Sequence, residues 1–279
     1  MVLATDPDAD RLGVYVKDKQ GEYHCLTGNM SGSLLADYEI SQIQATKGLP
    51  EDGVLIKTIV TTNLADAIAK HYGVKVIETL TGFKYIGQQI LNFETKGEGT
   101  YLFGFEESYG CLIGTHARDK DAIVATMALC EAAAYYRSKD MTLWDAMIEI
   151  YDKYGYYKDG IQTLTLKGID GSEKIKEIMD HLKNNTPEQI AGYKVLWARN
   201  YDNDTSTNMI NKAVLPTGLP KSNVVYYDLE DGAWLCVRPS GTEPKIKFYY
   251  GVVGTSIADA DRLSDEFGQA VMKMIEHLL

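Results

Sequence analysis

The chain has 279 residues, of which 45% are hydrophobic and 24% charged, as is typical of a soluble globular protein with one large or two ordinary domains. Its formal net charge of −11, without any block of Lys and Arg, argues against binding to nucleic acid or to an anionic membrane. The 4 cysteines form no CxxC pair and no apolar run approaches the ~18 residues of a membrane span, so we expect a cytoplasmic protein without a zinc site.

Strands and helices alternate in the first part of the chain. This alternation predicts a largely parallel or mixed α/β sheet that is covered by helices on both faces. A helix that begins at a Ser cap is expected in the segment SGSLLADYEISQI. The predicted strands are 2–5 (the end of a buried strand), 12–18, 53–60, 74–79 and 100–106, and the predicted helices are 31–43, 63–72, 83–93, 121–138 and 142–154.

The order of elements changes near residue 155. From there on, strands follow one another as in an antiparallel α+β domain, so we expect a domain boundary at this point. The second domain should be a four-stranded antiparallel sheet with helices on one face, although the pattern marks five strands in this part of the chain. Its predicted elements are strand 161–167, helix 172–184, strand 193–200, a polar loop 200–208, strands 223–229, 233–238 and 245–252, and a closing helix 258–278.

An acidic loop, ATDPDADRLG (4–13), follows the first strand and spaces Asp6, Asp8 and Asp10 two residues apart. Alternating carboxylates on a tight turn are suitable ligands for Mg²⁺. An EF-hand is excluded because its Gly and Glu positions hold Arg11 and Lys17. A haloacid-dehalogenase-type phosphatase usually has Thr or Val in place of Asp10, and no matching acidic pair follows. A solvated surface turn is the other alternative, but Arg11 favours a metal that shares its site with a phosphate.

A second loop, GFEESYG (104–110), ends a predicted strand at the edge of the sheet where ligands usually bind in α/β proteins. Glu106 and Glu107 offer acceptors for vicinal sugar hydroxyls, and Ser108 adds a donor. A glycosidase pair is disfavoured because sequence neighbours usually point apart, and a plain loop stays open as an alternative. The following segment, HARDKD (116–121), gathers local cations, namely His116, Arg118 and Lys120.

A third loop, RPSGTEPKIK (238–247), lies between two predicted strands of the last domain. Arg238 offers a bidentate fork for phosphate. Ser240 and Thr242 offer hydroxyls, Gly241 offers backbone N–H groups for an anion nest, and Lys245 adds a charge. A hairpin turn is the alternative interpretation. The segment is not a Walker loop, because GxxxxGK[ST] is absent.

Together these motifs resemble the α-D-phosphohexomutase superfamily, and within it the phosphoglucomutase-2-like branch of phosphoglucomutases and phosphopentomutases. ATDPDADRLG is similar to the metal-binding loop and TLTGFKYIG (79–87) to the sugar-specificity loop of that family. GFEESYG with HARDKDA is similar to the sugar-binding loop, and RPSGTEPKIKFYY to the phosphate-binding loop. The resemblance implies a last domain with a TATA-box-binding-protein-like fold, which says nothing about DNA.

One departure from the family pattern is the phosphoryl carrier. Family members have four domains, and a Ser in a TASHNP-like motif of the first domain carries the phosphoryl group; no TASHN-like segment occurs here. We therefore expect the C-terminal part of such an enzyme, inactive by itself. Residues 1–41 would end the second domain, 42–155 would form the third, sugar-binding domain, and 156–279 the fourth, phosphate-binding domain.

The resemblance implies a Mg²⁺-dependent exchange between sugar 1-phosphate and sugar 6-phosphate through a bisphosphate, with a glucose 1,6-bisphosphate-type activator. The alternatives are a non-catalytic phosphosugar-binding module, or phosphopentomutase or phosphomannomutase specificity in the parent enzyme. The preferred sugar and the oligomeric state stay open. By the resemblance, Asp6, Asp8 and Asp10 would hold the metal, Arg11 and Lys120 would be catalytic, and Gly82, Phe83, Glu106, Ser108, Arg118, Arg238, Ser240, Gly241 and Thr242 would bind the sugar phosphate.

Overall fold

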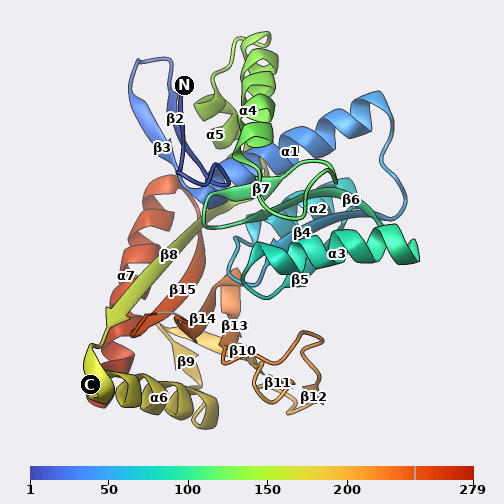
Figure 1. The fold of residues 1–279 in the computed structure, drawn as a ribbon. Helices are drawn as coiled ribbons and strands as arrows, with labels where there is room; N and C mark the ends of the chain where they lie inside the picture. Colours follow the sequence, from blue (N-terminus) through green and yellow to red (C-terminus); the bar gives the residue numbers. More distant parts are fainter. Residues whose placement is uncertain (242) are drawn as a thin grey trace. The chain divides into compact units, whose positions relative to one another are not determined.

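A computed structural model describes residues 1–241 and 243–279, and the chain divides into two compact units, Met1–Gly155 and Tyr156–Leu279 (Figure 1). Thr242, which we expected to bind phosphate, lies outside the described residues. Each unit has its own sheets and its own apolar core. Within the described part of the chain, no helix is both long and apolar enough to cross a membrane.

The main sheet of the first unit has the order β5-β4-β6-β7. Strand β4 (Gly53–Thr58) runs parallel to β5 (Lys75–Thr79) and β6 (Thr100–Glu106), and β7 (Gly110–Leu112) returns antiparallel to β6. Every residue of β4 is buried, as expected for a central strand covered on both faces. The prediction of a mixed, doubly covered sheet is confirmed.

Helices lie on both faces of this sheet (Figure 1). The apolar side of α3 (Phe83–Lys96) packs against β4 and forms one core layer. On the other face, α1 (Gly28–Thr46) approaches β6 so closely that a Cβ on Gly32 would lie 2.1 Å from the ring of Phe105. Helix α2 (Leu64–Tyr72) packs beside α1. The first unit is completed by α4 (Ala122–Arg137) and α5 (Leu143–Tyr154).

The N-terminal strands form a separate antiparallel sheet, β1-β2-β3. Strand β1 (Val2–Thr5) is largely exposed, so the prediction that it is buried is wrong for this structure. Strand β2 (Leu12–Lys17) alternates strictly between buried and exposed residues, and it pairs with β3 (Tyr23–Leu26), which the sequence pattern did not indicate. The alternation places one face of β2 against the body of the unit.

Helix α1 begins earlier than predicted. Its cap is Thr27, whose Oγ1 accepts a hydrogen bond from the backbone N–H of Met30 at 3.2 Å, so the predicted Ser cap is wrong. The boundary that we expected between residues 41 and 42 falls inside this helix. The assignment of 1–41, 42–155 and 156–279 to the second, third and fourth domains of a longer enzyme stays a prediction.

Helix α5 begins with a capping box, in which Thr142 Oγ1 accepts from Asp145 N at 3.1 Å and Thr142 N donates to Asp145 Oδ2 at 2.8 Å. Because Thr142→Ala removes the acceptor for the Asp145 N–H, we expect it to lower the free energy of unfolding by about 1 kcal/mol. Urea denaturation measures the change. The control is Thr46→Ala, whose hydroxyl only donates back to the Gln42 carbonyl, and it should cost little or nothing. An equal loss in both variants would contradict the capping argument.

In the described part of the second unit, 8 strands form one antiparallel sheet in the order β12-β11-β10-β13-β14-β15-β8, with β9 also paired to β10. The predicted number of four strands is therefore wrong. The predicted polar loop contains β11, and β9 and β12 are strands of 2 residues each, too short to show a period-2 pattern. The strands are β8 (Tyr156–Thr165), β9 (Gln189–Ile190), β10 (Tyr193–Asn200), β11 (Thr205–Asn208), β12 (Val214–Leu215), β13 (Val225–Leu229), β14 (Trp234–Pro239) and β15 (Lys245–Gly254).

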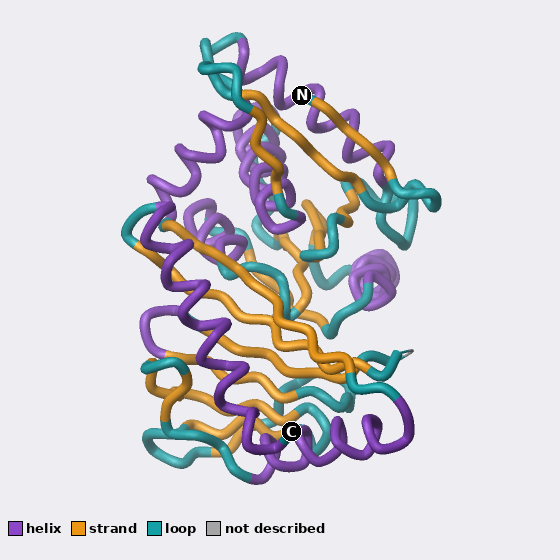
Figure 2. Tube along the Cα trace, turned by 90° about the vertical axis from the view of Figure 1, so that its left-hand side faces the viewer, coloured by secondary structure: helices purple, strands orange, loops and turns teal. Residues whose placement is uncertain are grey.

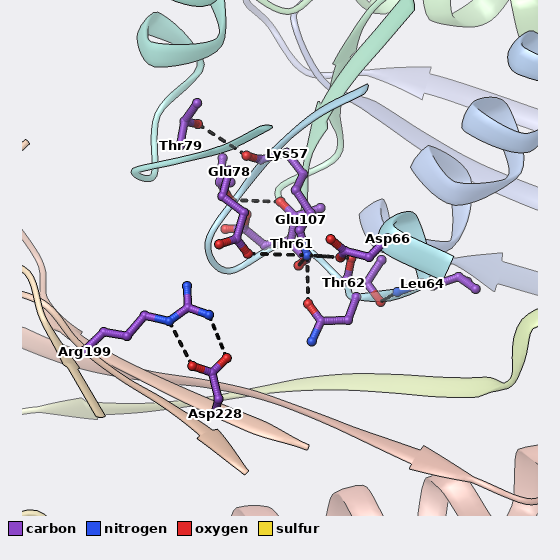
Figure 3. A network of polar contacts seen from close by, with 12 residues as sticks. Lys57, Thr61, Thr62, Leu64, Asp66, Glu78, Thr79, Glu107, Arg199 and Asp228 are labelled. Atoms are coloured by element: carbon purple, nitrogen blue, oxygen red, sulfur yellow. Dashed lines mark hydrogen bonds and ion pairs between the residues drawn. The ribbon is translucent and has the colours of Figure 1, made fainter. Parts of the chain in front are cut away.

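Two helices, α6 (Gly168–Asn184) and α7 (Ile257–Ile275), cover one face of this sheet, which confirms the predicted arrangement (Figure 2). Alternate residues of β13, β14 and β15 point into the core beneath them. The opposite face of β13 carries Tyr226, whose ring lies 4.7 Å from the guanidinium carbon of Arg199. Arg199 also forms a bidentate ion pair with Asp228, with N···O distances of 2.9 and 2.7 Å (Figure 3).

Candidate active site

Glu106 stands at the end of β6 with only 4% of its surface exposed. Its Oε1 accepts a hydrogen bond from Ser108 Oγ at 3.1 Å, whereas its Oε2 is buried and has no hydrogen-bond partner among the described residues. Burial raises the pKa of the carboxyl, although Lys120 and Ser108 act in the opposite direction. A buried acceptor without a donor is costly, so this oxygen is suited to receive a ligand hydroxyl.

Lys120 connects its own segment, 116–121, to the acidic loop and to the sugar loop. Its Nζ lies 3.1 Å from Asp10 Oδ2, 3.8 Å from Glu106 Oε1 and 2.8 Å from Asp119 Oδ1. The ammonium also lies 5.5 Å from the centre of the Phe83 ring. Burial alone would lower the pKa of Lys120, but hydrogen bonds to Asp119 and Asp10 outweigh it, so the pKa is raised. Lys120 therefore keeps its proton near neutral pH and offers a cation rather than a base.

The close approach of Lys120 depends on Gly110, where a Cβ would lie 2.0 Å from Lys120 Cδ. Backbone hydrogen bonds fix the loops to one another: Leu12 N donates to Tyr109 O at 3.0 Å, and Ala122 N donates to Ala9 O at 3.1 Å. Tyr109 and Ala9 both have positive φ, at 68° and 55°. Backbone strain of this kind clusters at functional sites, where the surroundings hold it in place.

The acidic loop does not gather its three carboxylates in this structure. Asp6 Oδ1 accepts from the backbone N–H groups of Asp10 and Arg11 at 3.3 Å each, and these bonds lower the pKa of Asp6 although desolvation raises it. Asp10 faces Lys120, and Asp8 is exposed. No three His, Cys, Asp or Glu side chains of the described residues are grouped so that they could hold a metal ion. The donor chemistry thus fits Mg²⁺, but the present arrangement does not.

We expect Mg²⁺ to bind the acidic loop with a Kd in the millimolar range or weaker, ~4 kcal/mol or less. Asp6 and Asp10 must first leave their present partners, and the three carboxylates repel one another. Amide shifts of residues 5–12 during a Mg²⁺ titration measure the affinity, and Asp8→Ala should abolish them. Asp265→Ala, an exposed site on α7, serves as the control. Micromolar affinity, or shifts that survive Asp8→Ala, would contradict this expectation.

The remaining predicted residues of the first unit lie in the same loops but make other contacts. Gly82 precedes α3 with φ +120°, which favours glycine. Arg11 is half exposed, with Nε 4.0 Å from Asp10 Oδ1. Arg118 pairs with Glu94 of α3 and donates to two backbone carbonyls of its own loop. The structure therefore joins Asp10, Phe83, Glu106, Ser108 and Lys120, whereas Arg118 is held by α3.

In the second unit, Arg238 lies near the end of β14 directly opposite Lys247 of β15. Like charges at opposite positions of an antiparallel pair repel, and a bound anion would remove that repulsion. The turn that follows is closed by a hydrogen bond from Ser240 N to Lys245 O at 2.7 Å, and among the described residues nothing lies within 4 Å of a Cβ built on Gly241. Sequence reasoning missed Lys247, although its position two residues after Lys245 is a detectable signal.

Sequence reasoning also missed Lys57, which is the next-to-last residue of β4 (Figure 3). Its side chain is only 1% exposed, and its ammonium contacts Asp66 of α2 and Glu78 of β5. The available signal is a charged residue inside the otherwise apolar strand GVLIKT. A buried charge at the carboxyl end of a parallel strand requires a partner and belongs to the edge where ligands bind.

Family models match both units. The model for phosphoglucomutase/phosphomannomutase, alpha/beta/alpha domain III, matches residues 27–164, and the model for the C-terminal domain of the same family matches 171–268. A phosphoglucomutase of Staphylococcus epidermidis is 36% identical over 267 residues, covering 93% of this chain and 48% of that protein. The chain thus spans about half the length of the curated relatives it matches.

Solved structures share the fold. Parafusin, a phosphoglucomutase from Paramecium in an open form, superposes with a TM-score of 0.67 and 20% identity over 98% of this chain and 45% of that chain. An Aspergillus fumigatus N-acetylphosphoglucosamine mutase, in complex with GlcNAc-6P and magnesium, has a TM-score of 0.52 and 16% identity over 96% of this chain and 51% of that chain. At such identities these likenesses show the fold alone.

Proposed function

Because the chain belongs to the phosphoglucomutase/phosphomannomutase family, with its domain III and its C-terminal domain, we propose that it is the sugar- and phosphate-binding part of a phosphoglucomutase-type enzyme. The parent reaction is the isomerisation of a sugar 1-phosphate to a sugar 6-phosphate through a bisphosphate. The observation that carries this proposal is the buried Glu106, with one oxygen bonded to Ser108 and the other without a partner among the described residues.

In the first unit, Glu106 accepts hydrogen bonds from sugar hydroxyls and Ser108 holds its carboxylate in place. Lys120, charged and close to Asp10 and Glu106, lies where it can neutralise a phosphoryl group or donate a proton to a leaving oxygen. Arg11 adds positive charge beside the same loop. Gly82 and Phe83 shape the approach of the sugar, and Arg118 contributes only if it leaves Glu94.

In the second unit, the segment 238–242 binds the phosphate that does not react. Arg238 and Lys247 supply the charge, and the turn at Ser240 and Gly241 supplies backbone donors. Thr242 is part of the proposal by its place in the motif. All of these donors are local to one hairpin, so the site should bind phosphate independently of the rest of the protein.

Mg²⁺, held by Asp6, Asp8 and Asp10, would supply charge neutralisation for the transferring phosphoryl group. The support is the chemistry of the donor set and a structural neighbour solved with magnesium. A glucose 1,6-bisphosphate-type activator, a sugar phosphate substrate and a cytoplasmic location belong to the same proposal. The choice between glucose, mannose and pentose substrates is left to experiment.

A phosphosugar-binding module without catalysis is the second candidate. It is favoured by one observation, namely that the 279 residues contain no TASHN-like segment to carry the phosphoryl group. The polypeptide of residues 1–279 is therefore expected to bind glucose 6-phosphate without converting glucose 1-phosphate, even when Mg²⁺ and glucose 1,6-bisphosphate are supplied. Turnover that disappears with Asp8→Ala would show that another group replaces the missing Ser, with Asp6 the first suspect.

Titration of the labelled protein with three probes tests the proposal. Glucose 6-phosphate should shift the amide signals of residues 80–83 and 105–110 in the first unit and of residues 238–241 in the second. Inorganic phosphate should shift 238–241 first, and glucose alone should have little effect. Shifts confined to other segments, or none with any probe at tens of millimolar, would refute the proposed function.

A further inference from the structure

Lys57 is a charged residue whose side chain is buried in the core of the first unit. It is among the largest fully buried side chains, and every other residue of β4 around it is buried as well. Its Nζ donates to Asn63 Oδ1 at 2.7 Å and forms an ion pair with Asp66 (Figure 3). Glu78 Oε1 lies 3.8 Å away, and the carbonyl oxygens of Thr61 and Thr62 lie at 3.5 and 3.4 Å.

The partners of this ammonium come from three different segments. Asn63 and the two threonines belong to the turn after β4, Asp66 to the first turn of α2, and Glu78 to the end of β5. Two further hydrogen bonds connect the same region, because the Thr79 hydroxyl donates to Lys57 O at 3.4 Å and the backbone Ile59 N donates to Thr79 O at 2.8 Å. One side chain therefore connects the carboxyl ends of two parallel strands.

The segment that follows β5 is Leu80–Thr81–Gly82, which leads into α3 at Phe83. This loop adjoins Lys120, because the Phe83 ring at its end lies beside the Lys120 ammonium. The residue after Lys57 reaches the sugar loop, because Thr58 Oγ1 donates to Glu107 Oε2 at 3.5 Å and contacts Thr61 Oγ1 at 2.8 Å. The contacts of Lys57 and of its neighbours Thr58 and Thr79 thus adjoin both loops of the proposed sugar site.

Stability alone does not explain a lysine at this position. A buried ion pair loses hydration that its mutual attraction only partly restores, and an apolar side chain of similar volume is often at least as stabilising. What the ion pair adds is a preference for one arrangement, since each acceptor must lie within reach of one ammonium. The neighbouring apolar residues of β4 show that the sheet core itself needs no charge here.

We propose that Lys57 is a positioning residue, whose ammonium holds the ends of β4 and β5 and the start of α2 so that loop 80–83 and the Glu107 side of the sugar loop have one conformation for the sugar. This inference rests on the proposed function, because it assigns Lys57 to the sugar site described above. It does not involve the phosphate loop 238–241, whose contacts are formed within the second unit.

A paired variant tests this role without leaving an unbalanced buried charge. Lys57→Met together with Asp66→Asn removes one positive and one negative charge, and Glu78, whose side chain is 30% exposed, keeps access to water. Lys70→Met together with Asp265→Asn, both exposed sites, is the matched control for the same change of charge. The readouts are the unfolding midpoint, amide hydrogen exchange without ligand, and the affinities for glucose 6-phosphate and inorganic phosphate.

The expected result is a folded variant whose amides at 59–63 and 79–83 exchange at least tenfold faster than in the wild type. Glucose 6-phosphate shifts in loop 80–83 should need at least tenfold more ligand, while inorganic phosphate binding at 238–241 stays unchanged. If exchange and affinity both match the wild type, the inference is wrong. If the wild type binds no phosphosugar at all, the proposed function fails, and the ligand-free exchange still decides the role of Lys57.

A single substitution covers the case in which the paired variant does not fold. Glu78→Gln weakens one contact at the partly exposed edge of the cluster and leaves Asp66 and Asn63 in place. It should speed exchange at 79–83 and weaken glucose 6-phosphate binding by about threefold, without altering 59–63. Exchange at 79–83 identical to the wild type would overturn the positioning role.

Discussion

Glu106→Gln is expected to weaken the binding of glucose 6-phosphate to residues 1–279 roughly 10- to 100-fold, about 1.5–3 kcal/mol, since hydrogen bonds to a charged group are lost. The substitution keeps the size of the side chain, but it replaces one buried carboxylate oxygen by an NH₂ donor. The NH₂ group would point towards Ser108, Lys120 or the sugar hydroxyl. Each of these groups would then lose the carboxylate oxygen that accepts its hydrogen bond or balances its charge. Isothermal titration and amide shifts of 105–110 measure the loss.

The pH dependence of this effect follows from the raised pKa of Glu106. Above that pKa the carboxylate is ionised and the wild type should bind better than the Gln variant. As the pH falls through it, the wild type becomes protonated, so the difference between the two proteins should shrink. An affinity ratio that does not change with pH would argue against an ionised Glu106 as the acceptor.

The contribution of Glu106 to stability should depend on pH in the opposite way to its contribution to binding. A carboxyl whose pKa is raised by folding favours the native state at pH values below its unfolded pKa, and this contribution is lost as the pH rises through the folded pKa. Near neutral pH Glu106→Gln is therefore not expected to lower the free energy of unfolding. Glu98→Gln, at an exposed site before β6, is the control and should change neither quantity. A destabilised Gln variant with normal binding would overturn the assignment.

Arg238→Ala is expected to weaken inorganic phosphate binding by roughly tenfold or more, since about 1.5–3 kcal/mol of charge-assisted hydrogen bonding is removed. Arg238→Lys should give an intermediate loss, because it keeps the charge but not the bidentate fork. The affinity should also fall with added salt, as screening weakens exposed charges. Amide shifts of 238–241 during a phosphate titration provide the measurement.

The stability of the same variant provides an internal check. Arg238 lies opposite Lys247, so its removal relieves a like-charge pair and should leave the free energy of unfolding equal or slightly higher. Arg262→Ala on α7 is the control, because this arginine pairs with Asp259 and Glu266 and should not affect phosphate binding. If Arg238→Ala binds phosphate as tightly as the wild type, residues 238–242 are not the anion site.

The sequence pattern predicted the long elements well, because their signals are local. Helix α5 carries an apolar stripe and its own capping box, and β4 is a β-branched run that needs no partner to be recognised. The short strands β9, β11 and β12 were missed. They exist through hydrogen bonds with β10 or with each other, and polar or two-residue segments carry no periodic signal of their own.

The acidic, sugar and phosphate motifs were recognisable from residue type and spacing alone, since Asp6, Asp8, Asp10, Glu106 and Arg238 stand in short contiguous loops. The sequence by itself therefore determined the family and the identity of most candidate ligand groups. It also indicated Lys120 as a cation beside the sugar loop. The spacing along the sequence does not determine which of these side chains are in contact.

Only the tertiary structure decided how the charges are paired. Lys120 contacts Asp10, which lies more than one hundred residues earlier in the chain, as well as the nearer Glu106. Arg118 is turned towards Glu94. The role of Lys57 follows from its burial in β4. The role of Lys247 follows from its position opposite Arg238 on the neighbouring strand. The physical reason is that a charge is stabilised by what surrounds it in space, and those surroundings are set by sheet pairing and helix packing between segments distant in sequence.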